Sequence, residues 1–368
     1  IHENLQRLMK EKNQGLSVVL SNVICNLNYM EIEEMFRFAL DLGVEGLYFT
    51  LVDTLEGTEE LLLNSGERKI ALLGLRAQFR MRIGEYAACL RLARRGLAAG
   101  SARGPRMSRL RGRLLAFSGV ATCELGRLSE GEALLRQALA LHLRSGDDEG
   151  AARVHYLLMG NVHVRRGDFA EAVEAARSAL LAARRSGDPL RVCHSLAALA
   201  YARASGGEGA TARAEAVEAL RLAEALEYRM IEGYAQYTLG LCALLARDAA
   251  AARESFEAAR RLGERVPETG LRTFPLTGLA RAALAAGNRH AARRHAGRAL
   301  TVARSLRDPF QEAEASLLLG ASCAARESAE RTRLWRRAEQ LLRRLGLRYD
   351  LHRLLLLRLE AERPPRDE

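Results

Sequence analysis

From residue 66 onward, small and large apolar residues recur at helical spacing, and the whole pattern returns about every 40 residues. The clearest marker is a small residue near the middle of the first helix of each copy, at intervals of 42, 41, 40, 40, 40 and 40 residues. Seven copies in frame predict seven helix pairs over residues 66–345. We call these markers the anchors, and they are Ala77, Gly119, Gly160, Ala200, Gly240, Ala280 and Gly320.

The sizes of the residues in each predicted pair favour close packing of its two helices. The residue four before the anchor is in most copies large and apolar, so that a large side chain fills the space beside a small one. In the second helix, small residues recur four apart on one face, as in Ala172 and Ala176 or Ala212 and Ala216. We therefore expect the second helix to approach the anchor of the first closely.

The predicted helix boundaries follow the same period. Asp188 and Asp308 each provide an N-cap acceptor and are followed by a proline that fits the first helical turn, and Asp147 is the matching cap one repeat before Asp188. Glycine, which adopts a left-handed backbone without a Cβ clash, follows the first helix in five copies. These glycines are Gly84, Gly126, Gly167, Gly207 and Gly287.

The Leu239-Gly240 and Leu319-Gly320 pairs, with alanines at the matching places of the second helix, resemble the tetratricopeptide repeat. The resemblance implies an all-α, right-handed α-solenoid of about seven helix pairs, with residues 346–368 as a capping helix and polar tail. The usual repeat of this family has roughly 34 residues. The longer unit of this chain resembles the sensor regions of large ATP-dependent bacterial transcription regulators and of kinase-linked signalling ATPases.

Residues 1–65 differ from the repeats and contain one alanine, Ala39. Segments such as Leu16–Ile24 and Leu42–Phe49 resemble the later βα units of radical S-adenosylmethionine enzyme barrels. The three closely spaced cysteines of that family are absent, since Cys25 stands alone, and without them the iron–sulfur cluster cannot be held. The segment is either a remnant or end of such a barrel, or an unrelated αβ cap. The pattern predicts a helix, a strand, a helix and a parallel strand over residues 1–12, 16–20, 30–42 and 46–51.

The formal net charge of +11 makes nucleic acid and acidic membrane lipid candidate partners, because a basic surface attracts polyanions. Residues 1–65 hold 4 Lys and Arg against 11 Asp and Glu, and the positive charge of the remainder is scattered among acidic residues along most helices. Nearly all basic residues are Arg, which favours a coding bias over selection for phosphate binding. A solvated surface is the favoured interpretation, and nucleic acid is the less favoured partner.

Cysteine usage and hydropathy indicate the compartment. Six separated cysteines, without a CxxC pair or a histidine at metal-ligand spacing, are typical of core residues in a reducing cytosol. No apolar run approaches the roughly 18 to 20 residues that span a bilayer, and residues 1–25 lack the layout of a signal peptide. We expect a cytoplasmic chain with no membrane partner. Its start at Ile1, without a Met, is consistent with a fragment of a longer polypeptide.

The repeats carry no pattern for catalysis. The run from Gly206 to Gly209 lacks the Lys-Ser/Thr of a phosphate-binding loop, and the histidines are not spaced for a zinc site. We expect no catalytic residue, no metal ligand and no cofactor.

The concave groove of such a solenoid is lined by the first helices, so residues there that are neither small nor apolar are candidate contacts. Arg and aromatic side chains supply much of the contact energy at interfaces. The family's clamp for a C-terminal carboxylate needs repeated Lys and Asn on this face, and Asn161 alone matches it. The register of the anchors selects Arg113, Asn161, Arg165, His194, Tyr201, Tyr234, Tyr237 and Arg281.

Three functions remain open on this evidence. The favoured one is a non-catalytic scaffold or sensor module of a bacterial regulatory or signalling assembly, with a protein or peptide in the groove. The second is the substrate-presenting part of a radical S-adenosylmethionine enzyme whose cluster-binding half lies outside this chain. The third is nucleic acid binding through the Arg-rich surface.

Overall fold

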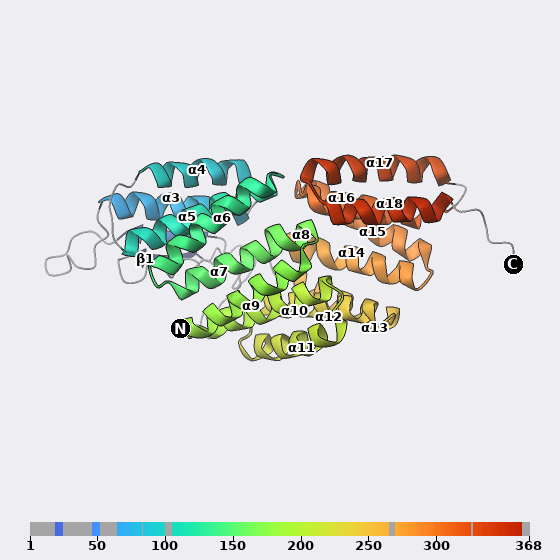
Figure 1. Ribbon diagram of the computed structural model, residues 1–368, viewed down its shortest axis with the longest axis horizontal. Coiled ribbons are helices and arrows are strands. Elements are labelled where there is room, and N and C mark those ends of the chain that lie inside the picture. Colours follow the sequence, from blue (N-terminus) through green and yellow to red (C-terminus); the bar gives the residue numbers. More distant parts are fainter. Residues whose placement is uncertain are drawn as a thin grey trace.

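The computed structural model describes residues 19–24, 46–51, 65–82, 84–99, 105–264, 269–324 and 327–362. Between Ser65 and Leu345 they form seven successive helix pairs, which confirms the predicted all-α solenoid (Figure 1). The first helices are α3 (Ser65–Arg82), α5 (Pro105–Glu124), α7 (Asp148–Leu158) with its continuation α8 (Val164–Arg166), α10 (Pro189–Ser205), α12 (Arg229–Leu245), α14 (Thr269–Ala285) and α16 (Pro309–Ser322). The second helices are α4 (Tyr86–Ala98), α6 (Leu128–Arg144), α9 (Phe169–Ser186), α11 (Gly209–Ala225), α13 (Ala249–Gly263), α15 (Arg289–Ser305) and α17 (Ser328–Leu345), and α18 (Arg348–Glu362) follows them.

The first helices form the inner layer of the solenoid. Helix α10 contacts α12, α12 contacts α14, and α14 contacts α16, whereas contacts between successive second helices are weaker. Each helix also packs against the next one in the chain. The stack therefore curves with the first helices on its concave side, because they lie closer together than the second helices do.

The anchors are matched in size to the second helix that covers them. A Cβ built on Gly240 would lie 2.5 Å from Phe256, one on Gly119 would lie 2.7 Å from Leu135, and one on Gly320 would lie 2.3 Å from Trp335. These distances leave no room for a methyl group, so glycine occurs where the covering residue is large. The anchors Ala77, Ala200 and Ala280 are fully buried.

Gly160 departs from this arrangement. A π-turn, Met159–His163, joins α7 to α8. Asp147, the N-cap of α7, lies 13 residues before Gly160, whereas Asp188 lies 12 before Ala200, and the π-turn absorbs this extra residue. Because the π-turn changes which side of the helix each residue faces, a Cβ on Gly160 would meet no atom within 4 Å. The expectation that this anchor lies against its second helix is wrong.

The predicted turns and caps are confirmed. The carboxylate of Asp147 accepts a hydrogen bond from the backbone N–H of Gly150, Asp188 accepts one from Leu190, and Asp308 accepts from the N–H groups of residues 310 and 311. Among the described turns between a first and a second helix, one left-handed position was missed, since Arg247 adopts a φ of 60° after α12. All five predicted turn glycines have positive φ, namely Gly84, Gly126, Gly167, Gly207 and Gly287.

Two strands precede the repeats. Strands β1 (Val19–Ile24) and β2 (Gly46–Leu51) pair in parallel, with Val19 opposite Gly46 and Ile24 opposite Leu51. The second strand and the parallel pairing match the prediction. The first strand overlaps the predicted one at residues 19 and 20 and continues to the β-branched Val23 and Ile24, which favour extended backbone, while residues 16–18 lie outside the described residues. The two predicted helices of this segment, over residues 1–12 and 30–42, lie outside the described residues.

The solenoid curves far enough for its third repeat to meet its end. Helix α18 contacts α8, and the rings of Phe169 and Tyr349 meet edge to face with centroids 4.9 Å apart. A Cβ on Gly126 would lie 3.0 Å from the side chain of Leu345. Figure 1 shows the α16 to α18 end beside α8. The inner helices therefore surround a space that is closed on one side by the last repeat.

Burial and hydropathy bear on two further expectations. The five cysteines within the described residues are buried and unbonded to one another, and burial raises the pKa of Cys89, Cys123 and Cys193 to about 12. Such thiols stay protonated and pack as small apolar groups. Of the helices in the described part of the chain, none is both long and apolar enough for a membrane crossing.

Candidate functional site

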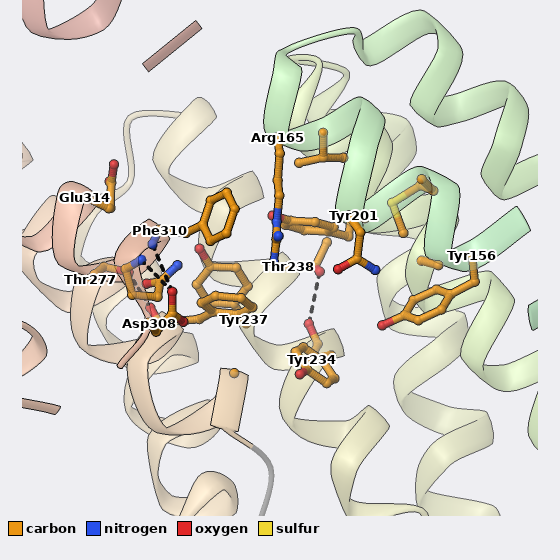
Figure 2. Close-up of a pocket in the computed structure, with 18 of the residues that line it drawn as sticks. Tyr156, Arg165, Tyr201, Tyr234, Tyr237, Thr238, Thr277, Asp308, Phe310 and Glu314 are labelled. Carbon is orange, nitrogen blue, oxygen red and sulfur yellow. Dashed lines mark hydrogen bonds between the residues drawn. The ribbon is translucent and has the colours of Figure 1, made fainter. Parts of the chain in front are cut away.

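The inner helices enclose a cavity of about 330 Å³ (Figure 2). Its wall is formed by residues of α5, α7, α8, α10, α12, α14 and α16, together with Tyr86 at the start of α4 and the start of α18. Seven of the eight residues that the anchor register selected lie on this wall. They are Asn161, Arg165, His194, Tyr201, Tyr234, Tyr237 and Arg281.

Arg113 is not brought to this cavity. It lines a separate pocket of about 30 Å³ with residues of α3 and α5, including Gln78 and Phe117. From the second repeat, Glu124, the last residue of α5, lines the main cavity. The structure therefore does not bring Arg113 into one cavity with Tyr237, and a contact of Arg113 with a ligand stays a prediction.

Aromatic rings form a continuous wall on three successive inner helices. The rings of Tyr201 and Tyr237 have centroids 6.3 Å apart, and those of Tyr237 and Phe274 are 5.7 Å apart. The ring of Tyr156 lies 4.2 Å from that of His194. These contacts hold the rings in place, so the wall exists before any ligand arrives.

The tyrosines of this wall are neutral hydrogen-bonding groups. Burial raises the pKa of the Tyr201 hydroxyl above its ordinary value, and it raises that of Tyr237 as well. Both hydroxyls stay protonated at neutral pH and can donate or accept. Thr238 lies beside them and donates its hydroxyl hydrogen to the carbonyl of Tyr234, 3.0 Å away (Figure 2).

A first charged group lies where α8 meets α16. Arg165 donates from Nη2 to a carboxylate oxygen of Glu124 at 2.6 Å, and its guanidinium carbon lies 3.8 Å from the ring centroid of Phe310. Burial raises the pKa of Glu124, although the Arg165 guanidinium opposes this. The surroundings of the pair therefore disfavour the charged carboxylate of Glu124. Its ionised form depends on the neighbouring guanidinium of Arg165.

A second charged group lies where α14 meets α16 and α18. Arg281 donates from Nε to Glu314 at 2.9 Å, and Arg353 of α18 lies 3.2 Å from Glu314 and 2.7 Å from Asp350. Burial alone would raise the pKa of Glu314, but the guanidiniums of Arg281 and Arg353 lower it to about 2. Burial and the neighbouring charge of Glu314 raise the pKa of Asp350.

Two polar atoms of the wall have no hydrogen-bond partner. They are Nη1 of Arg165, a donor, and Oε1 of Gln311, an acceptor, and both atoms are buried. Unpaired buried polar atoms are uncommon in folded proteins because each has lost its hydration. Both belong to residues that line the cavity, so a ligand with an acceptor and a donor could satisfy them.

The register argument missed part of the wall that it could have found. Phe274 and Glu314 occupy the position six residues before their anchors, as His194 and Tyr234 do, and the same rule applied to every repeat selects them. Asp350 could not be found this way. It comes from α18, which reaches the cavity through the closure of the stack.

The arrangement is suited to holding a ligand. Within the described ranges, no three His, Cys, Asp or Glu side chains converge where they could ligate a metal ion. The carboxylates of the cavity wall are bonded to guanidiniums, as in Glu124 and Glu314, or to backbone N–H groups at the start of a helix, as in Asp308. The site therefore offers an aromatic surface, two ion-pair clusters and several neutral hydroxyls.

No family model matches the chain, and no curated protein matches it. Solved structures resemble it in fold. The Rap protein complexed with Competence and Sporulation Factor is 14% identical, with 80% of this chain and 98% of that chain covered and a TM-score of 0.47. The apo form of the quorum sensor NprR from B. thuringiensis is 12% identical, with 92% and 96% covered and a TM-score of 0.48.

A Signal Transduction ATPase with Numerous Domains from Pyrococcus horikoshii, which has a tetratricopeptide repeat sensor, is 15% identical with a TM-score of 0.53. The similarity covers 98% of this chain and 50% of that chain, so this chain corresponds to about half of the larger protein. The two structures are similar in fold. The chain therefore folds as a solenoid of tetratricopeptide-like helical repeats.

Proposed function

We propose that this chain is a non-catalytic sensor or scaffold module that binds a peptide, or a peptide segment of a protein, in the cavity of its inner helices. The observation that carries the proposal is the convergence of aromatic rings from α10, α12 and α14 with ion pairs from α5, α8 and α16 around one enclosed space. Ligand sites are typically concave and largely apolar, with a few placed polar groups.

The size and chemistry of the cavity favour a short peptide. Its volume of about 330 Å³ lies at the lower end of the usual range for ligand pockets. A peptide offers apolar side chains to the tyrosine wall. Its backbone also offers a carbonyl for Arg165 and an N–H for Gln311, the two residues with unpaired buried atoms.

The similar fold of the Pyrococcus horikoshii ATPase supports a sensor role, because tetratricopeptide repeats form the sensor of that protein. In such an assembly, ligand occupancy of the repeats would be transmitted to a partner or to another domain. Catalysis is not part of the proposed role.

Nucleic acid binding receives less support. Many Arg side chains outside the cavity are ion-paired, as Arg293 is with Glu327 and Glu330, and Arg260 with Glu257. Their charge is largely offset locally. A gel shift of duplex DNA at low salt that weakens steeply with added salt would reverse this preference.

A glycine on the cavity wall provides a direct test. A side chain at Gly160 would meet no atom within 4 Å, so Gly160→Met should fill the cavity without disturbing the helix. Gly297 of α15 has the same open surroundings and lies away from the cavity, which makes Gly297→Met the matched control. Replacing a helical glycine should preserve or raise stability in both variants.

The experiment passes a pool of synthetic pentapeptides over each immobilised protein and identifies retained peptides by mass spectrometry. We expect the original protein and Gly297→Met to retain the same peptides and Gly160→Met to lose them, while circular dichroism shows equal helicity. Retention of the same peptides by Gly160→Met would exclude this cavity as the site. An absence of specific retention by the original protein would refute peptide binding.

The radical S-adenosylmethionine hypothesis keeps one supporting observation, the parallel pairing of β1 and β2. The sequence lacks the three-cysteine motif, so the chain would serve as the part that presents substrate to a separate cluster-binding half. Anaerobic reconstitution with iron and sulfide tests whether this chain holds a cluster itself. A colourless product would reject catalysis by this chain.

A further inference from the structure

The cavity gathers aromatic residues far beyond their abundance in the chain. The sequence contains 9 Tyr, 9 Phe and 1 Trp, and the wall holds five of the tyrosines and two of the phenylalanines. The faces of aromatic rings carry negative potential and attract ammonium and guanidinium groups. Arg165 over Phe310 is such a contact within the protein itself. The seven residues are Tyr86, Tyr156, Tyr201, Tyr234, Tyr237, Phe274 and Phe310.

The sign of the charge in the cavity is opposite to that of the whole protein. The chain carries a net charge of +11, but four carboxylates line the cavity against two guanidiniums. A third guanidinium, Arg353, contacts two of these carboxylates. One carboxylate therefore remains in excess. The four carboxylates are those of Glu124, Asp308, Glu314 and Asp350.

The carboxylate in excess is that of Asp308. Glu124 is paired with Arg165, and Asp350 with Arg353. Oδ1 of Asp308 accepts hydrogen bonds from the backbone N–H groups of Phe310 and Gln311. The guanidinium of Arg165 also attracts Asp308, but its hydrogen bond goes to Glu124. Figure 2 shows Asp308 beside Phe310 at this end of the cavity.

An unpaired acceptor lies beside this carboxylate. Oε1 of Gln311 is buried without a donor and belongs to the residue whose N–H bonds to Asp308. A ligand group that is rich in N–H donors would satisfy Gln311 and neutralise Asp308 together. Burial also raises the pKa of Glu124 and of Asp350, and a bound cation would favour the ionised form of both.

We propose that the group recognised in this cavity is an organic cation, the ammonium or guanidinium of a peptide, held between the carboxylate of Asp308, the amide oxygen of Gln311 and the tyrosine wall. This inference rests on the proposed function and specifies its ligand. A lysine or arginine side chain and a free N-terminal ammonium share the required chemistry. An anionic group would meet the excess carboxylate and bind more weakly.

The test uses the pentapeptide pool with free and acetylated N-termini. We expect the peptides that the original protein retains and Gly160→Met loses to be enriched in Lys, Arg or free N-termini over the input pool. The most enriched peptide is then resynthesised twice, once with norleucine in place of Lys or Arg and once with an acetylated N-terminus. Calorimetry with the two analogues shows which cation is bound.

Two matched substitutions place the cation in the cavity. Asp308→Asn removes the charge and keeps an N-cap, since Asn caps as well as Asp, and it should weaken the cationic peptide about tenfold. Asp188 caps α10 at the equivalent position three repeats earlier and does not line the cavity, so Asp188→Asn should leave binding unchanged.

The outcomes separate this inference from the proposed function. One outcome is that Gly160→Met abolishes retention while the retained peptides are no more cationic than the input pool. That result would overturn the proposed cation recognition, whereas the cavity would stand as the peptide site. Equal binding of the neutral analogues, or of the cationic peptide to Asp308→Asn, would also overturn it. If no peptide is retained specifically, the proposed function fails and this inference fails with it.

Discussion

The guanidinium carbon of Arg165 lies 3.8 Å from the ring centroid of Phe310, so that the third repeat touches the seventh across the mouth of the cavity. The same arginine is bonded to Glu124 of the second repeat. One side chain thus connects the second and third repeats with the seventh, which is distant in the chain. A solenoid repeat otherwise contacts its neighbours alone, so this connection and the contact of α18 with α8 together close the cavity.

Replacing Arg165 by Met should destabilise the protein in a pH-dependent way. Glu124 would lose its guanidinium while it stays buried, and breaking a buried pair by removing one partner costs about 3 to 5 kcal/mol. Burial already raises the pKa of Glu124, and without Arg165 it should rise further. The folded state would then hold its proton where the unfolded chain has released it.

The direction of the pH dependence of the stability deficit follows from this difference in proton binding. The cost of burying the Glu124 carboxylate is absent below its unfolded pKa and grows as the pH rises through its folded pKa. In urea titrations, the deficit of Arg165→Met should therefore be smallest near about pH 4 and larger near about pH 7. Adding Glu124→Gln should remove the pH-dependent part. A deficit that is equal at both pH values would contradict the pairing.

Asp147→Asn tests the buried pair at the N-terminus of α7. Oδ2 of Asp147 lies 2.8 Å from Nδ1 of His142, whose side chain is 1% exposed. Burial opposes ionisation of Asp147, but the hydrogen bonds from His142 and from the Gly150 N–H lower its pKa to about 2. The depressed pKa should contribute about 2 kcal/mol to stability above the unfolded pKa, and this contribution is lost as the pH falls towards 2.

The measurement compares the free energies of unfolding of both proteins by denaturant titration at neutral and at acidic pH. Asp147→Asn should lose stability at neutral pH, and the gap should narrow in acid. Asp248 caps α13 through the N–H of Ala251 and is not bonded to a histidine, so Asp248→Asn is the control and should change little. Equal losses in the two variants would show that capping alone explains the effect.

The repeat architecture was readable from the sequence because size and turn chemistry vary with one period. Asp188 and Asp308 cap helices as predicted, and the five glycines predicted at turns have positive φ. The π-turn at Met159–His163 was not predicted, although the spacing of 41 residues held the signal. A single extra residue can be absorbed by a bulge or a longer loop, and local sequence does not decide between them.

The candidate site was predictable only as far as it depends on register. Tyr201 and Tyr237 lie on the cavity wall because the register of an inner helix determines which side chains face inward. Arg113 follows the same rule and lies elsewhere, and Asp350 joins the wall from outside the repeats. Both depend on the curvature of the stack, which sums small rotations over many repeats and leaves no local pattern.

Turn residues offer a pair of opposite tests. Gly207 has a φ of 91° and open space around it, so Gly207→Ala should cost about 1 kcal/mol from backbone strain alone. Arg247 occupies the equivalent turn one repeat later with a φ of 60°, and Arg247→Gly should relieve a similar strain. The thermal unfolding temperature Tm should fall in Gly207→Ala, and in Arg247→Gly it should rise or stay the same. A clear loss in Arg247→Gly would show that its side chain makes a stabilising contact.

The fit between Gly240 and Phe256 should be visible as an energetic coupling. Gly240→Ala places a Cβ 2.5 Å from the Phe256 ring, and a Cβ built on Gly278 would lie 2.6 Å from the same ring, so the ring is packed closely against both α12 and α14. We expect a loss of about 1 to 3 kcal/mol from overpacking, and a loss of about 3 to 5 kcal/mol for Phe256→Ala from the cavity that it leaves. In Gly240→Ala with Phe256→Ala, the added methyl group occupies part of that cavity, so the double variant should lose clearly less than the sum. A double-mutant cycle from urea titrations measures this difference, and strict additivity would show that the two residues do not meet.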